Sequence, residues 1–427
     1  MIMKNKRYIN WLLVGIMAVV GLATTSCKDQ PDKYEIEEGL PTVYYVRSPY
    51  QSTRDSLMTG AYMGNTICIV GDNLRSVVEL WFNDQQAVLN TSFMTDHTIL
   101  VDVPNELPVV PTDKIYMVNA AGQVYSFDFQ VLIPGPVGSS MSNEWAQAGE
   151  TVTIYGDYLL DYENDHLSIR MPGDVPVTEI TSVSKTAVTF VVPAGVTESG
   201  YIYITTKYGT NRTKFYFRDD RCMLFDWDGT RGGFAIANGW RDGSAVKMDD
   251  GTGVDGAFIR FHATLAADGW TAPEDDLSFN YWSDATHPVL CTLPGFATLL
   301  GKYALDDLAV KFECRIPAAN AWKSTALQVI FCKDGTAGNS DYWEPTVPRA
   351  LWQPWTVGGS YDTGGLWTTI TVPLSNFNKT HTGEVCANAL SEEFLGGMMF
   401  YVMGGGSKGE ACDLQMDIDN IRVAPVD

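Results

Sequence analysis

The sequence is short of basic residues and of histidine. Its 29 lysines and arginines stand against 51 aspartates and glutamates, which gives a formal charge of −22 and a pI of about 4.5. A surface of this sign repels phosphate backbones and polyanionic glycans, so it argues against a nucleic-acid partner. The five histidines do not stand at metal-ligand spacing from one another. This balance favours a neutral ligand.

Cysteine is also scarce, and its spacing is irregular. Eight cysteines occur without any C-x-x-C pair, which argues against a zinc site and against a complete disulfide framework. If Cys27 carries lipid, an odd number remains, and we expect these thiols to be buried as small hydrophobic groups. A single disulfide within the last domain is the alternative. The remaining cysteines are Cys68, Cys222, Cys291, Cys314, Cys332, Cys386 and Cys412.

Long periodic runs of Ala, Leu, Glu and Lys, which would predict helices, are absent. Glycine, tyrosine, tryptophan, threonine and valine are common instead, a composition that is typical of short strands joined by turns. A chain of 427 residues is expected to form about two to four domains, each large enough for its own core. We therefore predict an all-β protein.

Residues 1–26 have the pattern of a signal peptide. Basic residues precede an apolar run from Trp11 to Leu22, and small residues follow up to Cys27. The run is shorter than the about 20 residues that span a bilayer, so cleavage before Cys27 and acylation of this cysteine would anchor the protein. An ordinary secreted protein is the alternative. The acidic stretch 28–32 resembles the signal that sends some Gram-negative lipoproteins to the cell-surface side of the outer membrane, and residues 27–39 form a lipidated tether.

An internal repeat follows the tether. The segments GNTICIVGDNL (Gly64–Leu74) and GETVTIYGDYL (Gly149–Leu159) share six identical positions and one that is Ile or Val, and they start 85 residues apart. Each continues with a strand pattern that ends in Val-Pro and with a hairpin, so each copy has the size of an immunoglobulin-like sandwich. We expect the second glycine of the motif to end a strand and the leucine to return to the core. The pattern resembles the IPT/TIG family of immunoglobulin-like domains, which predicts two such domains at residues 40–132 and 133–217.

Residues 218–427 have a different character, because nine of the twelve tryptophans lie there. The alternation of Val310 and Phe312 with Lys311 and Glu313 predicts a strand with one buried face. Several such patterns in about 210 residues predict two packed antiparallel sheets in a jelly-roll-like sandwich.

Signals for catalysis are weak. The string GGSKG at residues 405–409 matches G-x-S-x-G, but a nucleophile elbow needs a following helix and an α/β sheet, and neither is predicted. Paired carboxylates could form a glycosidase, yet no pair stands out among the acidic residues. We predict no enzyme activity and no cofactor, and an endo-acting polysaccharide hydrolase remains the alternative.

Acidic clusters near both ends of the last domain offer oxygen ligands of the kind that calcium prefers. The alternative is a row of aspartates on a solvent-facing strand edge, and we predict no metal site. The residues concerned are Asp226, Asp228, Asp417, Asp419 and Asn420.

Aromatic residues in segments rich in Pro, Gly, Asn and Asp suggest a different function. An exposed indole or phenol ring can stack on the apolar face of a pyranose, and we call such a ring an aromatic platform. For each candidate the alternative is a ring that covers the core. Trp227, Trp240 and Trp322 are expected in the core, and Trp367 at a strand end. The predicted platforms are Trp270, Tyr281, Trp282, Tyr342, Trp343, Trp352 and Trp355.

The whole pattern resembles the surface glycan-binding proteins of Sus-like polysaccharide-utilisation systems, in particular the SGBP-B type with a xyloglucan-binding last domain. The resemblance is carried by Cys27, the IPT/TIG-like repeat and the motifs WQPW (352–355), GLWTTITVPL (365–374) and DIDNIRV (417–423). It implies a non-catalytic lipoprotein that holds polysaccharide for a SusC/SusD-like outer-membrane transporter, with the immunoglobulin-like domains as spacers. Two spacers rather than three is a departure from that type. A surface adhesin is a further alternative.

Overall fold

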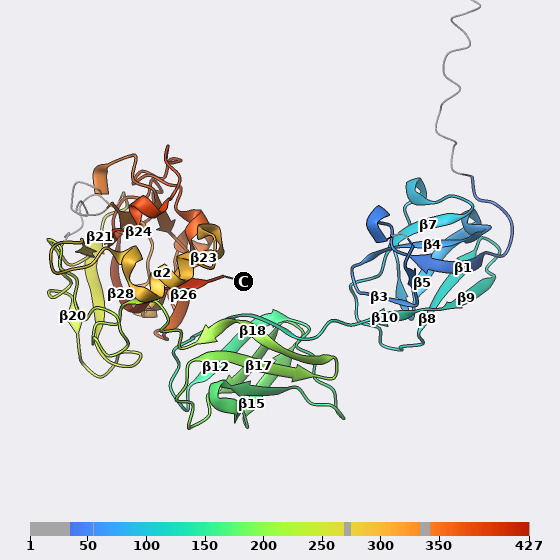
Figure 1. Cartoon of the computed structure of the whole chain (residues 1–427), viewed down its shortest axis with the longest axis horizontal. Coiled ribbons are helices and arrows are strands. Elements are labelled where there is room, and N and C mark those ends of the chain that lie inside the picture. The colour runs from blue at the N-terminus through green and yellow to red at the C-terminus, as the bar shows by residue number, and fades with distance from the viewer. Residues whose placement is uncertain (1–34, 54, 269–274, 334–341, 427) are drawn as a thin grey trace, which may run out of the picture. The chain divides into compact units, whose positions relative to one another are not determined.

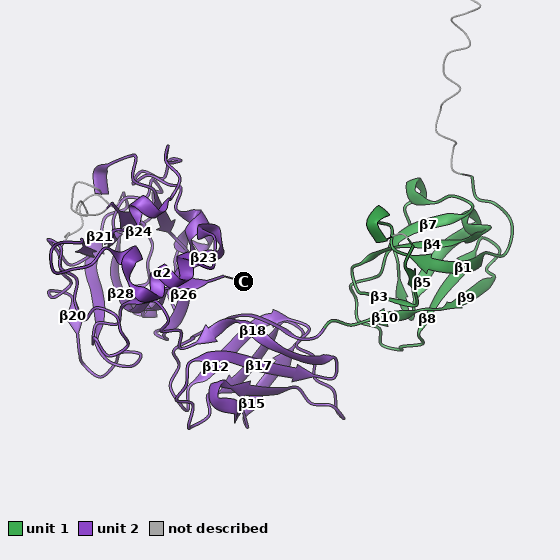
Figure 2. Cartoon of the chain, in the orientation of Figure 1, with its two compact units in different colours: residues 1–134 green, residues 135–427 purple. Residues whose placement is uncertain are grey.

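The computed structural model describes residues 35–53, 55–268, 275–333 and 342–426, in which most of the regular secondary structure is β-strand (Figure 1). The chain divides into two compact units, Met1–Pro134 and Gly135–Asp427 (Figure 2). The all-β prediction is therefore confirmed. No helix in these ranges is long and apolar enough to cross a bilayer. The predicted signal peptide and lipidated Cys27 lie outside the described residues.

The first unit is a β-sandwich whose core is filled by side chains such as Ile67, Ile69 and Ile115. One sheet has the order β2-β1-β4-β7 and the other β6-β5-β8-β9, while β10 runs parallel to β3. The strands are β1 (Thr42–Arg47), β2 (Leu57–Met58), β3 (Gly60–Tyr62), β4 (Thr66–Asp72), β5 (Val77–Phe82), β6 (Gln85–Gln86), β7 (Thr98–Asp102), β8 (Lys114–Asn119), β9 (Val124–Asp128) and β10 (Gln130–Leu132).

The second unit begins with a similar sandwich, whose core includes Ile154, Phe190 and Ile204. Its sheets have the orders β11-β12-β16-β15 and β14-β13-β17-β18. The strands are β11 (Val137–Met141), β12 (Thr151–Asp157), β13 (Ser168–Met171), β14 (Val175–Pro176), β15 (Ile180–Ser184), β16 (Ala187–Val191), β17 (Gly200–Thr206) and β18 (Gly209–Phe217).

The repeated glycine is the last but one residue of its strand, close to the strand end that the sequence predicts. Gly71 lies within β4 and Gly156 within β12. A Cβ atom would come 1.8 Å from the Thr42 carbonyl oxygen in the first case and 1.7 Å from the Val137 carbonyl oxygen in the second. Glycine is therefore needed because the backbone of the paired strand, β1 or β11, passes very close to it beside a register shift. The leucines that end the motif, at positions 74 and 159, are buried as predicted.

The terminal domain is a sandwich of two antiparallel sheets, which confirms the predicted architecture. The β28 sheet has the order β20-β21-β28-β23-β26, with β19 paired to β28, and the β27 sheet has the order β22-β27-β24-β25. Its elements are β19 (Met223–Phe225), β20 (Lys247–Met248), β21 (Phe258–Leu265), β22 (Ser278–Tyr281), α2 (Pro294–Leu300), β23 (Leu308–Arg315), β24 (Leu327–Cys332), β25 (Arg349–Trp352), α4 (Trp355–Gly358), β26 (Thr368–Pro373), β27 (Gly397–Val402) and β28 (Cys412–Pro425).

Aromatic side chains join the two sheets of this domain. Phe279 and Phe400 of the β27 sheet stack at 5.2 Å, and Phe312 of the β28 sheet meets Phe400 edge-on at 5.4 Å. These rings belong to one large apolar cluster. The inner faces of both sheets are thereby occupied by the core, and only their outer faces and the connecting loops can form a surface site.

Strand β23 is buried on both faces, so the prediction of one buried face is wrong. Lys311 and Glu313 point away from the core but are covered by the immunoglobulin-like part of the same unit, where Glu144 accepts a hydrogen bond from Lys311 at 2.6 Å. Trp145 is buried beside Trp367 in a small cluster at the same junction. The amide of Thr369 in β26 also donates to the Ser142 carbonyl at 2.9 Å.

Most of the described cysteines behave as small hydrophobic groups. Cys68, Cys222, Cys314 and Cys386 are buried thiols. Burial raises the pKa of Cys222 to about 12 and that of Cys314 well above its ordinary value. These thiols are therefore protonated at neutral pH and do not act as nucleophiles.

Candidate functional site

The outer face of the β27 sheet carries polar and aromatic side chains in register. Ser278, Tyr401, Gln328 and Leu351 stand opposite one another across β22, β27, β24 and β25. Their neighbours along each strand point into the core, because successive side chains of a strand alternate between faces. The first three are buried beneath a layer of loops. The surface above this face is therefore made by those loops.

Buried Arg349 holds one of these loops in place at the β25 edge. Its guanidinium donates to the Tyr342 carbonyl at 2.7 Å, to the Glu344 carbonyl at 3.1 Å and to Gln328 Oε1 at 3.1 Å. The Gln328 amide also donates to the Tyr342 hydroxyl at 3.3 Å. Because the buried guanidinium donates its hydrogen bonds to these oxygen atoms, Arg349 fixes the loop and does not present a cation to an external ligand.

Trp343 projects from this anchored loop and is 49% exposed. Its ring contacts Tyr342 edge-on at 4.5 Å and His381 at 5.6 Å. Burial and the nearby Arg349 charge lower the pKa of His381, so its imidazole is neutral at neutral pH. The indole thus rests against two aromatic rings, and about half of its surface stays exposed.

Trp240 occupies the opposite edge and is 76% exposed. The chain around it is fixed to β22, since Gly239 N donates to the Asn280 carbonyl at 2.9 Å and Asn280 N donates to the Arg241 carbonyl at 2.7 Å. A Cβ atom on Gly239 would lie 2.1 Å from Asn280 Oδ1, so only glycine allows this approach. Arg241 is paired with Asp275 at 3.1 Å.

A hollow of about 380 Å³ lies beside Trp240, which is at the small end of the range of ligand pockets. It is lined by Trp240, Arg241, Asp275 and Ser278 among others. The Arg241 guanidinium also lies 5.6 Å from the Tyr401 ring, and Tyr401 meets Tyr342 at 4.6 Å. A continuous row of contacts therefore links the two exposed tryptophans across the sheet.

The two tryptophans are separated by the width of the sheet. They stand next to the edge strands β22 and β25 of the described β27 sheet, and three strand spacings amount to about 14 Å. An exposed indole at each end of such a span suits an extended ligand of several units better than a single small molecule.

Comparison with known proteins identifies the class of molecule. Residues 217–425 match the family described as surface glycan-binding protein B xyloglucan binding domain, and residues 136–217 match the IPT/TIG domain. The structure is similar to that of surface glycan-binding protein PbSGBP-B from Prevotella bryantii, with 36% sequence identity and a TM-score of 0.71 over 91% of this chain and 100% of that one. The chain belongs to the surface glycan-binding protein B family.

A curated relative of this family member is an IPT/TIG domain-containing protein from Bacteroides ovatus, 26% identical over 218 residues. The match covers 48% of this chain and 43% of that protein, so the chain spans less than half of the relative's length. The family consists of binding proteins rather than enzymes, in agreement with the expectation of no catalytic activity.

Three of the predicted platforms in this surface glycan-binding protein are core residues. Tyr281, Tyr342 and Trp355 are at most 5% exposed, so none offers a ring face at the surface. The Tyr281 hydroxyl donates to the Pro288 carbonyl at 2.6 Å, and the Trp355 indole donates to the Thr325 carbonyl at 2.8 Å. Pro354, directly before Trp355, has helical backbone angles and caps α4.

Other predicted platforms are half-buried. Trp352 packs against Trp322 at 5.3 Å and against Tyr361 at 5.5 Å, at one end of the core. Trp282 also packs against the core. Trp270 lies outside the described residues. Trp367 immediately precedes β26 and packs in the junction cluster, as expected of a strand-end residue.

Sequence reasoning missed Trp240, which was expected in the core because it stands near the start of the domain. Trp227 and Trp322 were assigned to the core in the same way and are buried. The signal that distinguishes Trp240 is the Asn238-Gly239 pair directly before it, which favours a turn at the surface.

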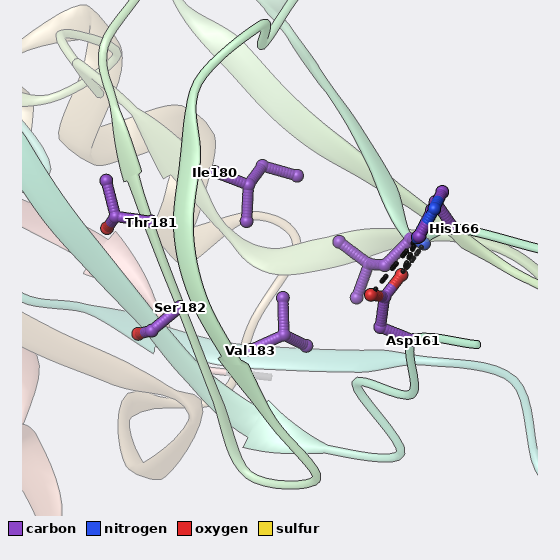
Figure 3. Close-up of a pocket in the computed structure, with 7 residues that line it drawn as sticks. Asp161, His166, Ile180, Thr181, Ser182 and Val183 are labelled. Carbon is purple, nitrogen blue, oxygen red and sulfur yellow. Dashed lines mark hydrogen bonds and ion pairs between the residues drawn. The ribbon is translucent and has the colours of Figure 1, made fainter. Parts of the chain in front are cut away.

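A separate hollow of about 490 Å³ lies on the second immunoglobulin-like sandwich (Figure 3). Its lining combines the exposed Asp161–His166 pair, 3.2 Å apart, with Thr181, Ser182 and aliphatic side chains. No tryptophan or tyrosine is among its lining residues. It therefore lacks the stacking surface found on the terminal domain.

Proposed function

We propose that this protein is a non-catalytic, cell-surface lipoprotein that captures a neutral plant-type glycan, a hemicellulose or β-glucan such as xyloglucan. The observation that carries the proposal is the pair of exposed tryptophans, Trp240 and Trp343, at opposite edges of the β27 sheet. This sheet lies within the residues that match a xyloglucan-binding family.

Stacking on these rings supplies the binding energy. A pyranose that covers about 60 to 100 Å² of apolar area gains on the order of 2 kcal/mol for each ring. Polar groups beside the rings, such as Arg241 and Asp275 at the hollow, can bind the hydroxyl rim of the sugar. Two such contacts amount to about 4 kcal/mol, which corresponds to a Kd of about 1 mM, so hydrogen bonds to the hydroxyl rim have to offset the ordering costs.

The charge of the protein supports an uncharged polysaccharide. The formal charge of −22 repels uronic or sulfated chains, and the Arg349 cation beneath the site is already occupied by carbonyl oxygens. Arg241 is likewise neutralised by Asp275. A hemicellulose or β-glucan backbone carries no charge and meets no such barrier.

We further propose that Cys27 carries the lipid that holds the protein on the outer membrane, where it passes glycan to a SusC/SusD-like transporter. The signal-like residues 1–26 and the acidic stretch 28–32 support this placement. In this arrangement the two immunoglobulin-like domains act as spacers between the anchor and the terminal domain.

Affinity gel electrophoresis of the full soluble chain, from residue 28, tests the proposal. We expect xyloglucan or mixed-linkage β-glucan to retard the protein and polygalacturonate to leave its migration unchanged. A parallel reducing-sugar assay should show no product. Retardation by none of the neutral glycans would contradict the binding function, and release of reducing ends would indicate a hydrolase instead.

A further inference from the structure

Two buried oxygen atoms near the end of β28 lack a hydrogen-bond donor. Asp419 and Asn420 are both 0% exposed. Asp419 Oδ2 and Asn420 Oδ1 have no hydrogen-bond partner. A buried polar atom that loses its contacts with water costs free energy unless another group replaces them. These atoms therefore point to a ligand at this place.

The backbone is irregular at these two residues. Asn420 has a φ of 49° inside a strand, and the pairing of β23 with β28 shifts register between Glu313 and Lys311. The Asn420 amide nitrogen donates to Asp419 Oδ1 at 2.8 Å. Left-handed backbone is costly for a residue other than glycine and is often found at functional positions.

Two further carboxylates stand next to these residues. Asp255 accepts a hydrogen bond from Asn420 Nδ2 at 3.0 Å, and its side chain is largely buried. Asp228 accepts from Ala257 N with both oxygens, at 3.0 and 3.1 Å. A Cβ atom on Gly256 would lie 2.1 Å from Asp228 Oδ2, so the loop that carries Asp255 is pressed directly against Asp228.

The carboxylates in this cluster repel one another. Asp228, Asp255 and Glu313 are all near enough to Asp419 to act on it through their charges. Opposite charge comes from Arg231, 3.1 Å from Asp255, and from Arg422, which is engaged with Glu313 at 2.7 Å. The cluster holds more negative than positive charge.

We propose that Asp228, Asp419 and the Asn420 amide oxygen form a calcium-binding site, with Asp255 holding the Asn420 side chain through its hydrogen bond to Nδ2. Calcium prefers carboxylate and amide oxygens and takes six to eight of them in flexible geometry. Zinc and copper are disfavoured because none of these side chains is a histidine or cysteine. No three His, Cys, Asp or Glu side chains among the described residues are arranged to hold an ion by themselves, so main-chain carbonyls or waters complete the shell.

The other acidic residues of the two end clusters are occupied elsewhere. Asp226 accepts from the amides of Gly229 and Arg231 in its own turn. Asp417 is paired with Arg260 at 2.7 Å and with Arg315 at 2.6 Å. The candidate site thus lies between the loop after β19, the loop between β20 and β21, and residues 419–420 of β28. An ion here would tie the start of the terminal domain to its last strand.

Calcium binding can be measured on the full soluble chain after treatment with EDTA. We expect Ca²⁺ at about 100 times its Kd to raise the Tm of the terminal domain by roughly 5 to 10 °C, with a smaller effect of Mg²⁺. Tb³⁺ should show luminescence when tryptophan is excited, because buried Trp227 directly precedes Asp228. Both signals should be lost in Asp419→Asn, and Asp306→Asn, which changes an exposed carboxylate, should keep them.

The outcomes separate the proposal from a neutral, protonated Asp419. If Asp419→Asn does not fold, Asp228→Asn provides the same comparison. A wild-type Tm that does not respond to Ca²⁺, with no Tb³⁺ luminescence, would overturn the proposal. The same follows if both variants respond to Ca²⁺ as the wild type does. Because neither readout uses glycan binding, the result is independent of the proposed function.

Discussion

Glu144 and Arg422 form a buried ion pair between two domains, with Glu144 Oε2 2.9 Å from Arg422 Nη2. Glu144 belongs to the second immunoglobulin-like sandwich and Arg422 to the last strand of the terminal domain. Lys311 and Glu313 complete the network, and all four side chains are buried. The second immunoglobulin-like domain is therefore a structural partner of the terminal domain.

Glu144→Gln should destabilise the protein by about 3 to 5 kcal/mol, because it leaves buried Lys311 and Arg422 with one carboxylate between them. Urea unfolding followed by tryptophan fluorescence measures this change. Glu163→Gln is the matched control, since Glu163 is exposed in the same domain. Equal stability of the two variants would show that the network contributes little.

Deleting the second immunoglobulin-like domain should weaken the terminal domain even though the glycan site is untouched. A fragment of residues 218–427 exposes Lys311, Glu313 and Arg422 and loses the packing of Trp145. We expect a lower Tm than for residues 135–427 and an unchanged affinity for xyloglucan at a temperature where both are folded. Equal Tm values would contradict this view of the junction.

Trp240→Ala and Trp343→Ala should each reduce glycan affinity by about 30-fold with little change in Tm. The loss corresponds to about 2 kcal/mol of stacking energy for each ring. Isothermal titration calorimetry with a xyloglucan oligosaccharide measures the affinity. Val357→Ala, at another exposed apolar side chain, should bind as the wild type does. Wild-type affinity in both tryptophan variants would rule out these rings as platforms.

Trp355→Ala should behave in the opposite way. Removal of this buried ring, and of its hydrogen bond to Thr325, is expected to cost about 3 to 5 kcal/mol of stability. The unfolding free energy in urea measures the loss, and Trp343→Ala is the control of the same chemistry at an exposed site. If Trp355→Ala unfolds at the same urea concentration as the wild type, Trp355 is again a candidate aromatic platform.

Gly156→Ala should destabilise the second immunoglobulin-like domain by about 1 to 3 kcal/mol or more, because the added methyl group meets the Val137 carbonyl. Gly358→Ala, where no atom lies within 4 Å of the new Cβ, should be close to neutral. Thermal unfolding of both variants makes the comparison. A stable Gly156→Ala protein would show that β11 can move away from β12.

The sequence predicts the sandwiches because alternation and turn residues are local signals. Whether a ring is exposed depends on residues far along the chain, and there the sequence is a poor guide. Trp355 is buried because it begins a four-residue helix, whereas Trp240 is exposed because it follows a glycine that packs closely against Asn280. The burial of Lys311 could not be predicted from local sequence either, since its partner Glu144 is 167 residues away in the chain.

The two faces of the terminal sandwich have separate neighbours. Lys311 and Glu313 on the β28 sheet meet the immunoglobulin-like domain, while Trp240 and Trp343 lie over the far side of the β27 sheet. A pulling force on a captured polymer would therefore be transmitted through both sheets and the aromatic core between them before it reached the second immunoglobulin-like domain. If the protein holds polysaccharide as proposed, the buried ion pairs among Glu144, Lys311, Glu313 and Arg422 would carry this load.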